Sequence, residues 1–196
     1  DAEYALFADD DVTYFDGMPQ RVLAEFEARP DADVLIFGMD YTKEGTVIER
    51  RRPGDQRRHL WNSMRFGAAS MAVRLQAVRS CGIHFSTYFG GGCLYGAGED
   101  NLFLRDCFTN GLRVYSTNTV LGVCRKDAST WFSGCNEKYF YDKGALMTYL
   151  FPHLRHLAAL YFAVRVKKHT EIGCLKRIKL MLAGVRGGKR LEPYQP

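Results

Sequence analysis

The stretch Tyr4–Thr13 is a short apolar run that stops at three consecutive acids. Apolar residues in a row, with Tyr and Phe among them, are typical of a strand buried on both faces, as in a parallel sheet. The stretch Asp33–Tyr41 has the same character and is predicted as a second strand. Between them, apolar residues at helical spacing predict a helix over Met18–Arg29 that stops before Pro30. Strands alternating with helices favour an α/β fold.

The remaining pattern predicts short elements separated by irregular segments. We expect an exposed loop at Glu49–Arg58, where basic residues follow no period. We expect an irregular segment at Ile83–Gly98, whose glycines let the backbone approach a ligand closely. The other predicted elements are a hairpin over Gly38–Glu49, strands at Ala68–Val73, Leu112–Ser116 and Thr119–Val123, helices at Arg74–Ser80 and from Glu99 to Gly111, and a helical part from Asn136 onward.

The three acids after the first strand, Asp9, Asp10 and Asp11, are candidates for a metal site. Ligands of open α/β sheets bind at the carboxyl ends of such strands. Two carboxylates ~4 Å apart repel by roughly 1 kcal/mol in water and ~4 kcal/mol at an effective dielectric near 20, so the cluster favours a bound cation. Mg²⁺ takes one or two protein carboxylates and completes its shell with water and phosphate oxygens. Asp9 and Asp11 would be the ligands, and an Asp-rich turn without a metal is the alternative.

A second pair of acids, Glu99 and Asp100, lies in the first turn of a predicted helix. Acids at this position commonly stabilise the helix dipole. The alternative is catalysis, because an Asp with an ordinary pKa near 4 is ionised at pH 7 and can take a proton from an attacking hydroxyl.

Composition is that of one soluble globular domain, or most of one, with a net charge of +5. Lys and Arg crowd into Arg50–Arg58 and Lys167–Arg190, which suggests an acidic partner such as a phospholipid surface or, alternatively, a solvated basic face. The six cysteines show no Cys-x-x-Cys pair, as expected of reduced thiols inside a cell. No secretory signal is present, and because the first residue is Asp we expect the chain to begin inside a longer sequence or after processing.

Together these residues resemble glycosyltransferase family 2, the GT-A type of nucleotide-sugar-dependent transferase. The matching segments are Ala5–Val12 as the Asp-x-Asp strand, Pro30–Val34 after its helix, and Gly98–Arg105 as the Glu-Asp motif. Two later segments, Ser129–Phe132 and Glu137–Gly144, are similar to the branch that builds bacterial surface and capsular polysaccharides in the cell envelope. The resemblance implies a mixed, Rossmann-like GT-A sheet flanked by helices.

The resemblance also implies a role for each acid. Asp9 and Asp11 would hold Mg²⁺ or Mn²⁺ against the donor diphosphate, and Asp10 would lie nearer the ribose or sugar. Asp100 would be the base that deprotonates the acceptor hydroxyl, with Glu99 supporting it, in an inverting, metal-dependent transfer of a single sugar. Further implied contacts are Arg105 with the donor, and Gly91, Gly92 and Trp131 with the acceptor. The implied partners are a nucleotide-sugar donor and a glycan or lipid-linked acceptor, with no nucleic acid.

The sequence departs from the family in three ways. The family opens with strands that bind the nucleotide, and nothing like them precedes Asp1. Residues 1–135 would therefore be a partial GT-A catalytic domain that lacks those N-terminal strands, and residues 136–196 would be a basic helical extension. The Gln-x-x-Arg-Trp motif of processive synthases is absent, which favours a non-processive enzyme. The His that many relatives add as a metal ligand is absent too, since the corresponding stretch is Val123–Lys126.

Two other interpretations stay open. The stretch Phe7–Thr13 also resembles the nucleophile motif of haloacid-dehalogenase-type phosphatases, in which Asp9 would be the nucleophile and Asp11 the acid. Those enzymes place a lysine shortly before their late acids, and this sequence has none between Lys43 and Lys126. A catalytically inactive, binding-only relative of the transferases is the second alternative.

The segment Ala145–Val164 is long and apolar enough to suggest a membrane, but Pro152 and Arg155 at its centre argue against a spanning helix. Leucines at helical spacing and a basic flank predict an interfacial helix pair instead, on the anionic inner leaflet of the plasma membrane. This would make the protein cytoplasmic and peripheral. The alternative is an ordinary amphipathic helix packed on the catalytic domain.

Overall fold

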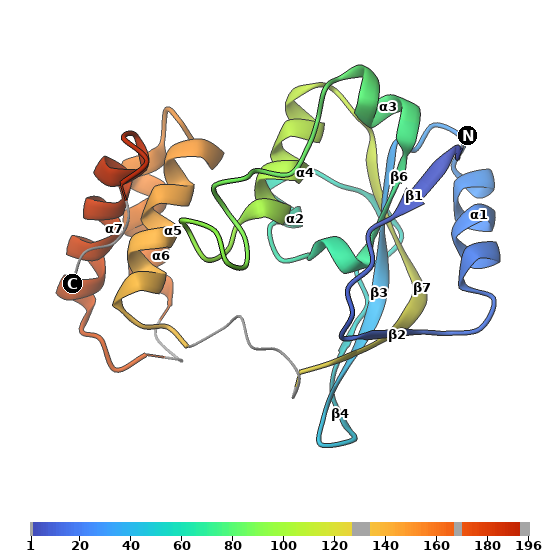
Figure 1. Ribbon diagram of the computed structural model, residues 1–196, viewed down its shortest axis with the longest axis horizontal. Coiled ribbons are helices and arrows are strands. Elements are labelled where there is room, and N and C mark those ends of the chain that lie inside the picture. Colours follow the sequence, from blue (N-terminus) through green and yellow to red (C-terminus); the bar gives the residue numbers. More distant parts are fainter. Residues whose placement is uncertain (1, 127–133, 167–169, 193–196) are drawn as a thin grey trace. The chain divides into compact units, whose positions relative to one another are not determined.

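The structure, a computed structural model, describes residues 2–126, 134–166 and 170–192 (Figure 1). These residues fall into two units. The first unit contains residues 2–84 and 103–126, and the second contains residues 85–102, 134–166 and 170–192. The division at residue 135 expected from the sequence stays a prediction, and the structure adds that residues 85–102 group with the C-terminal helices.

The first unit is built on a mixed sheet, which has seven strands among the described residues. The order is β1-β6-β3-β7-β2, with β4 paired to β3 and β5 paired to β7. The strands are β1 (Tyr4–Leu6), β2 (Val12–Tyr14), β3 (Val34–Lys43), β4 (Thr46–Arg51), β5 (Gln56–Arg57), β6 (Met71–Arg74) and β7 (Val114–Arg125). The helices of this part of the chain are α1 (Met18–Ala28), α2 (Leu60–Ser63), a 3-10 turn at Ala68–Ser70, α3 (Leu75–Ser80) and α4 (Glu99–Thr109), whose first residues belong to the second unit.

The strand directions decide where the acids emerge. Strand β3 is parallel to β7, whereas β6 is antiparallel to both β3 and β1. Strand β1 therefore runs in the same direction as β3 and β7. The acids that follow β1 therefore lie at the carboxyl ends of these three parallel strands, as predicted from the sequence. The predicted α/β fold with a mixed sheet flanked by helices is confirmed.

The core forms because β3 is apolar on both of its faces. Alternate residues Leu35, Phe37 and Met39 join Val22 and Phe26 of α1 in one cluster. The residues between them are buried as well, as expected for a central strand. The predicted helix over Met18–Arg29, the central strand and the hairpin after it are all confirmed as α1, β3 and β4.

Three sequence predictions were wrong in detail. Strand β1 was expected to be buried on both faces, but its three residues are only half-buried. The segment Glu49–Arg58 was expected to be an exposed loop, but it contributes to β4 and forms β5. Arg58, which follows β5, is buried. Its Nε donates to Ser116 Oγ of β7 at 2.7 Å, so the buried charged group has a hydrogen-bond partner. The two strands expected between Leu112 and Val123 form one strand, β7.

The second unit contains three C-terminal helices, α5 (Glu137–Leu150), α6 (Arg155–Arg165) and α7 (Cys174–Gly188) (Figure 1). Helices α5 and α7 cross with their backbones in contact, because glycine stands at the crossing. A Cβ added to Gly184 would lie 1.9 Å from Tyr141 O, and one added to Gly144 would lie 2.1 Å from Met181 O. The predicted helical character from Asn136 onward is confirmed. No helix within the described residues is long and apolar enough to cross a membrane.

Candidate functional site

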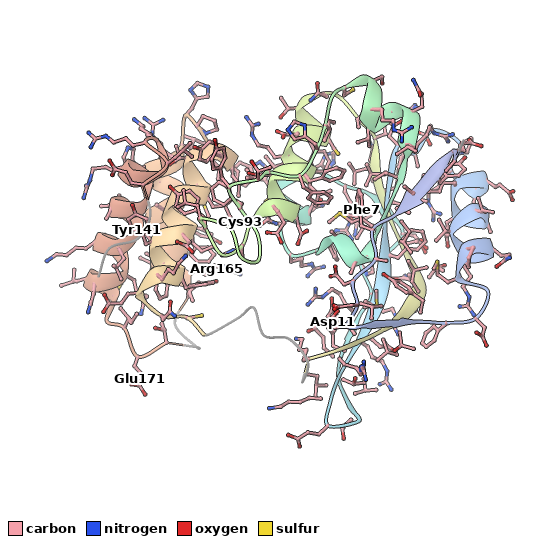
Figure 2. All side chains as sticks on the ribbon, in the orientation of Figure 1. Phe7, Asp11, Cys93, Tyr141, Arg165 and Glu171 are labelled. Atoms are coloured by element: carbon pink, nitrogen blue, oxygen red, sulfur yellow. The ribbon has the colours of Figure 1, made fainter. Side chains whose placement is uncertain are left out.

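The first acidic motif is a turn that joins β1 to β2. Two backbone hydrogen bonds fix it: Val12 N donates to Asp9 O at 3.3 Å, and Arg125 N donates to Asp11 O at 3.0 Å. Asp9 and Asp10 are exposed, whereas Asp11, which is labelled in Figure 2, is half-buried. The turn therefore offers carboxylates at the carboxyl edge of the sheet with a backbone that neighbouring strands hold in place.

A thiol that contacts Asp11 and a phenol that interacts with its charge are both neutral at physiological pH. Cys124 donates its thiol hydrogen to Asp11 Oδ2 at an Sγ–Oδ2 distance of 3.6 Å. Burial, and after it the Asp11 carboxylate, raises the pKa of the Cys124 thiol to about 11. Burial also raises the pKa of Tyr14, and the charges of Asp9 and Asp11 act in the same direction. A protonated thiol and a protonated phenol do not neutralise the negative charge of Asp11.

The acidic turn offers oxygen ligands of the kind that Mg²⁺ prefers. Among the residues that the structure describes, no three His, Cys, Asp or Glu side chains gather closely enough to form a complete site. Asp9 and Asp11 supply two carboxylates, and Mg²⁺ is commonly held by one or two carboxylates with substrate phosphates filling other positions. The neutral thiol of Cys124 does not suit such a hard cation. Within the described residues these two carboxylates form no metal site by themselves, so a metal held by Asp9 and Asp11 stays a prediction.

The second acidic motif, Glu99 and Asp100, opens helix α4 after the glycine-rich loop. Gly98 N donates to Glu99 Oε2 at 2.8 Å, which fixes the Glu99 side chain at the helix start. Gly90 has a φ of 131°, and a Cβ there would lie 3.4 Å from Glu99 Cδ. The loop thus closes around Glu99 at a position where only glycine is unstrained. Both acids are half-buried.

Helix α5 holds this loop from its other side, within the same unit. Asp142 Oδ2 accepts from Gly96 N at 2.9 Å and also pairs with Lys138 Nζ. Leu146, one turn further along α5, touches Gly98 so closely that a Cβ on that glycine would lie 2.7 Å from Leu146 Cδ1. Helix α5 therefore fixes Gly96 and Gly98 in the loop that leads into the acids.

Lys143 of α5 is a second basic residue near these acids, after Lys138. Burial lowers the pKa of Lys143, and the carboxylates of Glu99, Asp100 and Asp142 oppose that shift. Its Nζ also lies 5.6 Å from the centre of the Tyr139 ring. Sequence reasoning gave Asp142 and Lys143 no role. The available signal was an acid and a base in succession within an otherwise apolar helical segment.

The remaining predicted site residues are distributed over the two units. Gly91 and Gly92 are exposed in the loop before α4, and Gly92 has a φ of 78°. Arg105 pairs with its neighbour Asp106 at 2.8 Å in the first unit. Trp131 lies outside the described residues. The structure thus groups Asp9, Asp10 and Asp11 in the first unit and Glu99, Asp100 and the two glycines in the second.

Comparison with known proteins gave similarity at the level of the fold. No protein-family model matches the chain, and no curated protein matches its sequence. Among solved structures, the crystal structure of S. aureus TarS residues 1–349, a glycosyltransferase, is similar with a TM-score of 0.51 and 12% identity. The likeness covers 94% of this chain and 46% of that one, so this chain spans about half the length of its structural neighbour. The chain therefore has a glycosyltransferase-like fold, a mixed α/β sheet flanked by helices.

Proposed function

We propose that this chain is part of a glycosyltransferase that moves one sugar from a nucleotide-sugar donor to a hydroxyl of a glycan or glycolipid. The observation that carries the proposal is the acidic turn of Asp9–Asp11, which emerges at the carboxyl edge of a sheet with a glycosyltransferase-like fold. Ligands of α/β sheets bind at that edge. A diphosphate brings negative charge to the turn, and a divalent metal held by Asp9 and Asp11 would neutralise it.

In this proposal, Asp100 is the general base of an inverting transfer. The acceptor oxygen forms a bond to the anomeric carbon while the bond from that carbon to the diphosphate oxygen breaks. The hydroxyl proton passes to Asp100, and the electron pair of the broken bond leaves with the nucleoside diphosphate. Glu99, which is held by Gly98 N, fixes the helix start beside the base. Lys143 lies near both carboxylates, since their charges oppose the lowering of its pKa by burial.

The mixed sheet favours the transferase over the phosphatase interpretation. Strand β6 runs against β1 and β3, and the fold likeness to TarS covers 94% of this chain. The lysine that the phosphatase needs before its late acids is absent from the sequence between Lys43 and Lys126.

Two variants of the complete protein test the assignment. Asp100→Asn removes the base, so we expect sugar transfer to fall at least about 100-fold with donor binding nearly unchanged. Asp11→Asn removes a metal ligand, so we expect metal-dependent affinity for nucleoside diphosphates to fall at least about tenfold. Isothermal titration with UDP, GDP, CDP and dTDP, with and without Mn²⁺, measures binding. Asp16→Asn is the matched control, because Asp16 is an exposed acid in the next turn of the same unit.

Each contrary result has a definite meaning. Equal diphosphate affinity with and without Mn²⁺ refutes the metal role of Asp11. Loss of donor binding in Asp100→Asn refutes the base assignment. Metal-dependent binding without transfer to any glycan acceptor would favour the interpretation as a binding protein. Hydrolysis of p-nitrophenyl phosphate that depends on Asp9 would favour the interpretation as a phosphatase.

A further inference from the structure

Helix α6 packs with its small residues inward. Ala159 and Ala163 are completely buried in the core of the second unit, where they meet Met181 and Val185 of α7. Alanine at these positions lets the helices approach closely. Of the large apolar residues of α6, Phe162 also packs against this core, so the inner face of the helix consists of two alanines and one aromatic ring.

The other large apolar residues of α6, together with Leu154 just before it, face solvent. They recur three or four positions apart, so they share one face of the helix. We call this set the outer stripe, and its members are between 36% and 65% exposed. The outer stripe consists of Leu154, Leu157, Leu160, Tyr161 and Val164. An amphipathic helix that only packed on its own protein would place such residues in the core.

Positive charge borders the outer stripe. Arg165 Nη1 donates to Tyr161 Oη at 3.1 Å, and its guanidinium carbon lies 5.8 Å from the centre of that ring. The side chain thus lies along an apolar neighbour while its charge stays in water, as basic residues do at membrane interfaces. Lys176 and Lys179 of α7 are exposed as well. From His153 to Arg190 the sequence has ten Lys and Arg residues and one acid, Glu171.

A second copy of the chain fits this surface poorly. The outer stripe has five residues, whereas a stable protein interface takes about 20–30 residues and about 800 Å² from each partner. Pairing two copies through α6 would also bring their basic borders together, and like charges at an interface oppose binding. An anionic phospholipid surface accepts the apolar stripe and neutralises its basic border at once.

We propose that α6 is an interfacial membrane helix whose outer stripe enters the headgroup region of an anionic bilayer. Eleven residues make a helix about 16 Å long, and such helices bury their apolar face about 5–10 Å deep while lying in the plane of the membrane. Arg165 contacts lipid phosphates, and the exposed Lys179 of α7 adds positive charge to the same unit, whereas Lys176 pairs with Glu137. Binding at this surface does not depend on sugar transfer, so vesicle binding tests it separately from the proposed function.

The test is co-sedimentation of the complete protein with vesicles of phosphatidylcholine and phosphatidylglycerol at 3:1, and with vesicles of phosphatidylcholine alone. We expect binding to the anionic vesicles that weakens as salt is raised and is weaker on the neutral ones. Leu157→Ser and Tyr161→Ser change the two most exposed members of the outer stripe. Each should weaken binding about tenfold or more, because the lost apolar contact is a large part of interfacial affinity.

Leu23→Ser is the matched control, since Leu23 is a 46% exposed leucine on α1 in the other unit. It should bind vesicles like the unchanged protein. Both stripe variants should keep the circular dichroism and unfolding midpoint of the unchanged protein, because the substituted side chains are solvent-exposed. Equal vesicle binding by all proteins overturns the proposal. Loss of a dimer in the stripe variants, measured by light scattering with no vesicle binding in any protein, would assign the surface to a second copy instead.

Discussion

Gly98→Ala is the substitution that most directly links the fold to the candidate site. Gly98 has a φ of 128°, and the residue after it is Glu99. A Cβ at this position would lie 2.7 Å from Leu146 Cδ1 and 2.8 Å from Leu146 Cδ2. Leu146 is buried in the second unit, so its side chain has little space into which it can move.

Two costs add in this variant. The backbone conformation is strained for any residue with a side chain, at about 1–3 kcal/mol. The overlap with Leu146 forces movement in a packed core, at about 1–3 kcal/mol. A reduction in unfolded-state entropy offsets about 0.4–1 kcal/mol. We therefore expect Gly98→Ala to lower the free energy of unfolding by roughly 2–4 kcal/mol, measured by urea unfolding followed by circular dichroism.

A double-mutant cycle separates the two costs. Leu146→Val removes the two methyl groups that a Cβ on Gly98 would meet, and alone it should cost about 1 kcal/mol. In the Gly98→Ala background the same change should relieve the overlap, so the double variant should be more stable than the sum of single effects by about 1–2 kcal/mol. Additivity within about 0.5 kcal/mol would show that α5 does not press on the loop before the acids, and the positioning role of Leu146 would be refuted.

Two further predictions follow from contacts within single units. Because burial and Asp11 raise the pKa of Cys124 to about 11, iodoacetamide at pH 8 should label the exposed Cys174 and leave Cys124 unmodified, as measured by mass spectrometry. Asp11→Asn should speed the labelling of Cys124, and an unchanged labelling rate would contradict the contact between the two side chains. Gly184→Ala should lower the free energy of unfolding by at least about 2 kcal/mol, because its Cβ overlaps the backbone of α5. Gly173→Ala, where a Cβ meets open space, should change stability by less than about 1 kcal/mol in the same urea experiment, and equal effects would contradict the close crossing.

The parts of the fold that could be predicted from the sequence are those with a strong local pattern. Strand β3 is continuously apolar because both its faces are covered, and α1 has the helical spacing of a single packed face. Strand β1 has the same apolar pattern, yet it is only half-buried, since it lies at the end of the strand order within the described residues. An apolar run indicates a strand but does not reveal its place in the sheet.

Long-range partners explain why other predictions failed. Arg58 belongs to a basic stretch that appeared solvated, but its partner Ser116 is 58 residues away along the chain. Strand β7 appeared as two strands because polar residues interrupt its apolar pattern near Asn118. The neighbouring strand accommodates this with register shifts on either side of Gly38, whose Cβ would lie 3.3 Å from Asn118 O. Neither feature has a signal in the local sequence.

The acids of the candidate site were identifiable from sequence, whereas the residues that hold them were not. Asp9, Asp11 and Asp100 stand out because acids follow an apolar run or open a helix. Asp142 acts through Gly96, 46 residues earlier, and no spacing rule connects the two.

The C-terminal helices also gain a structural role that their composition did not suggest. Helix α5 bonds to Gly96 through Asp142 and contacts Gly98 through Leu146, so the backbone that leads into Glu99 and Asp100 is fixed by residues of the helical part. Helix α7 in turn holds α5 through the glycine crossing at Gly184. A change at that crossing should therefore reach the acids, because α5 cannot shift without moving the loop that it holds. Sugar transfer by the complete protein should fall in Gly184→Ala at temperatures where circular dichroism still shows it folded. Full activity in that variant would mean that the loop keeps its position without α5.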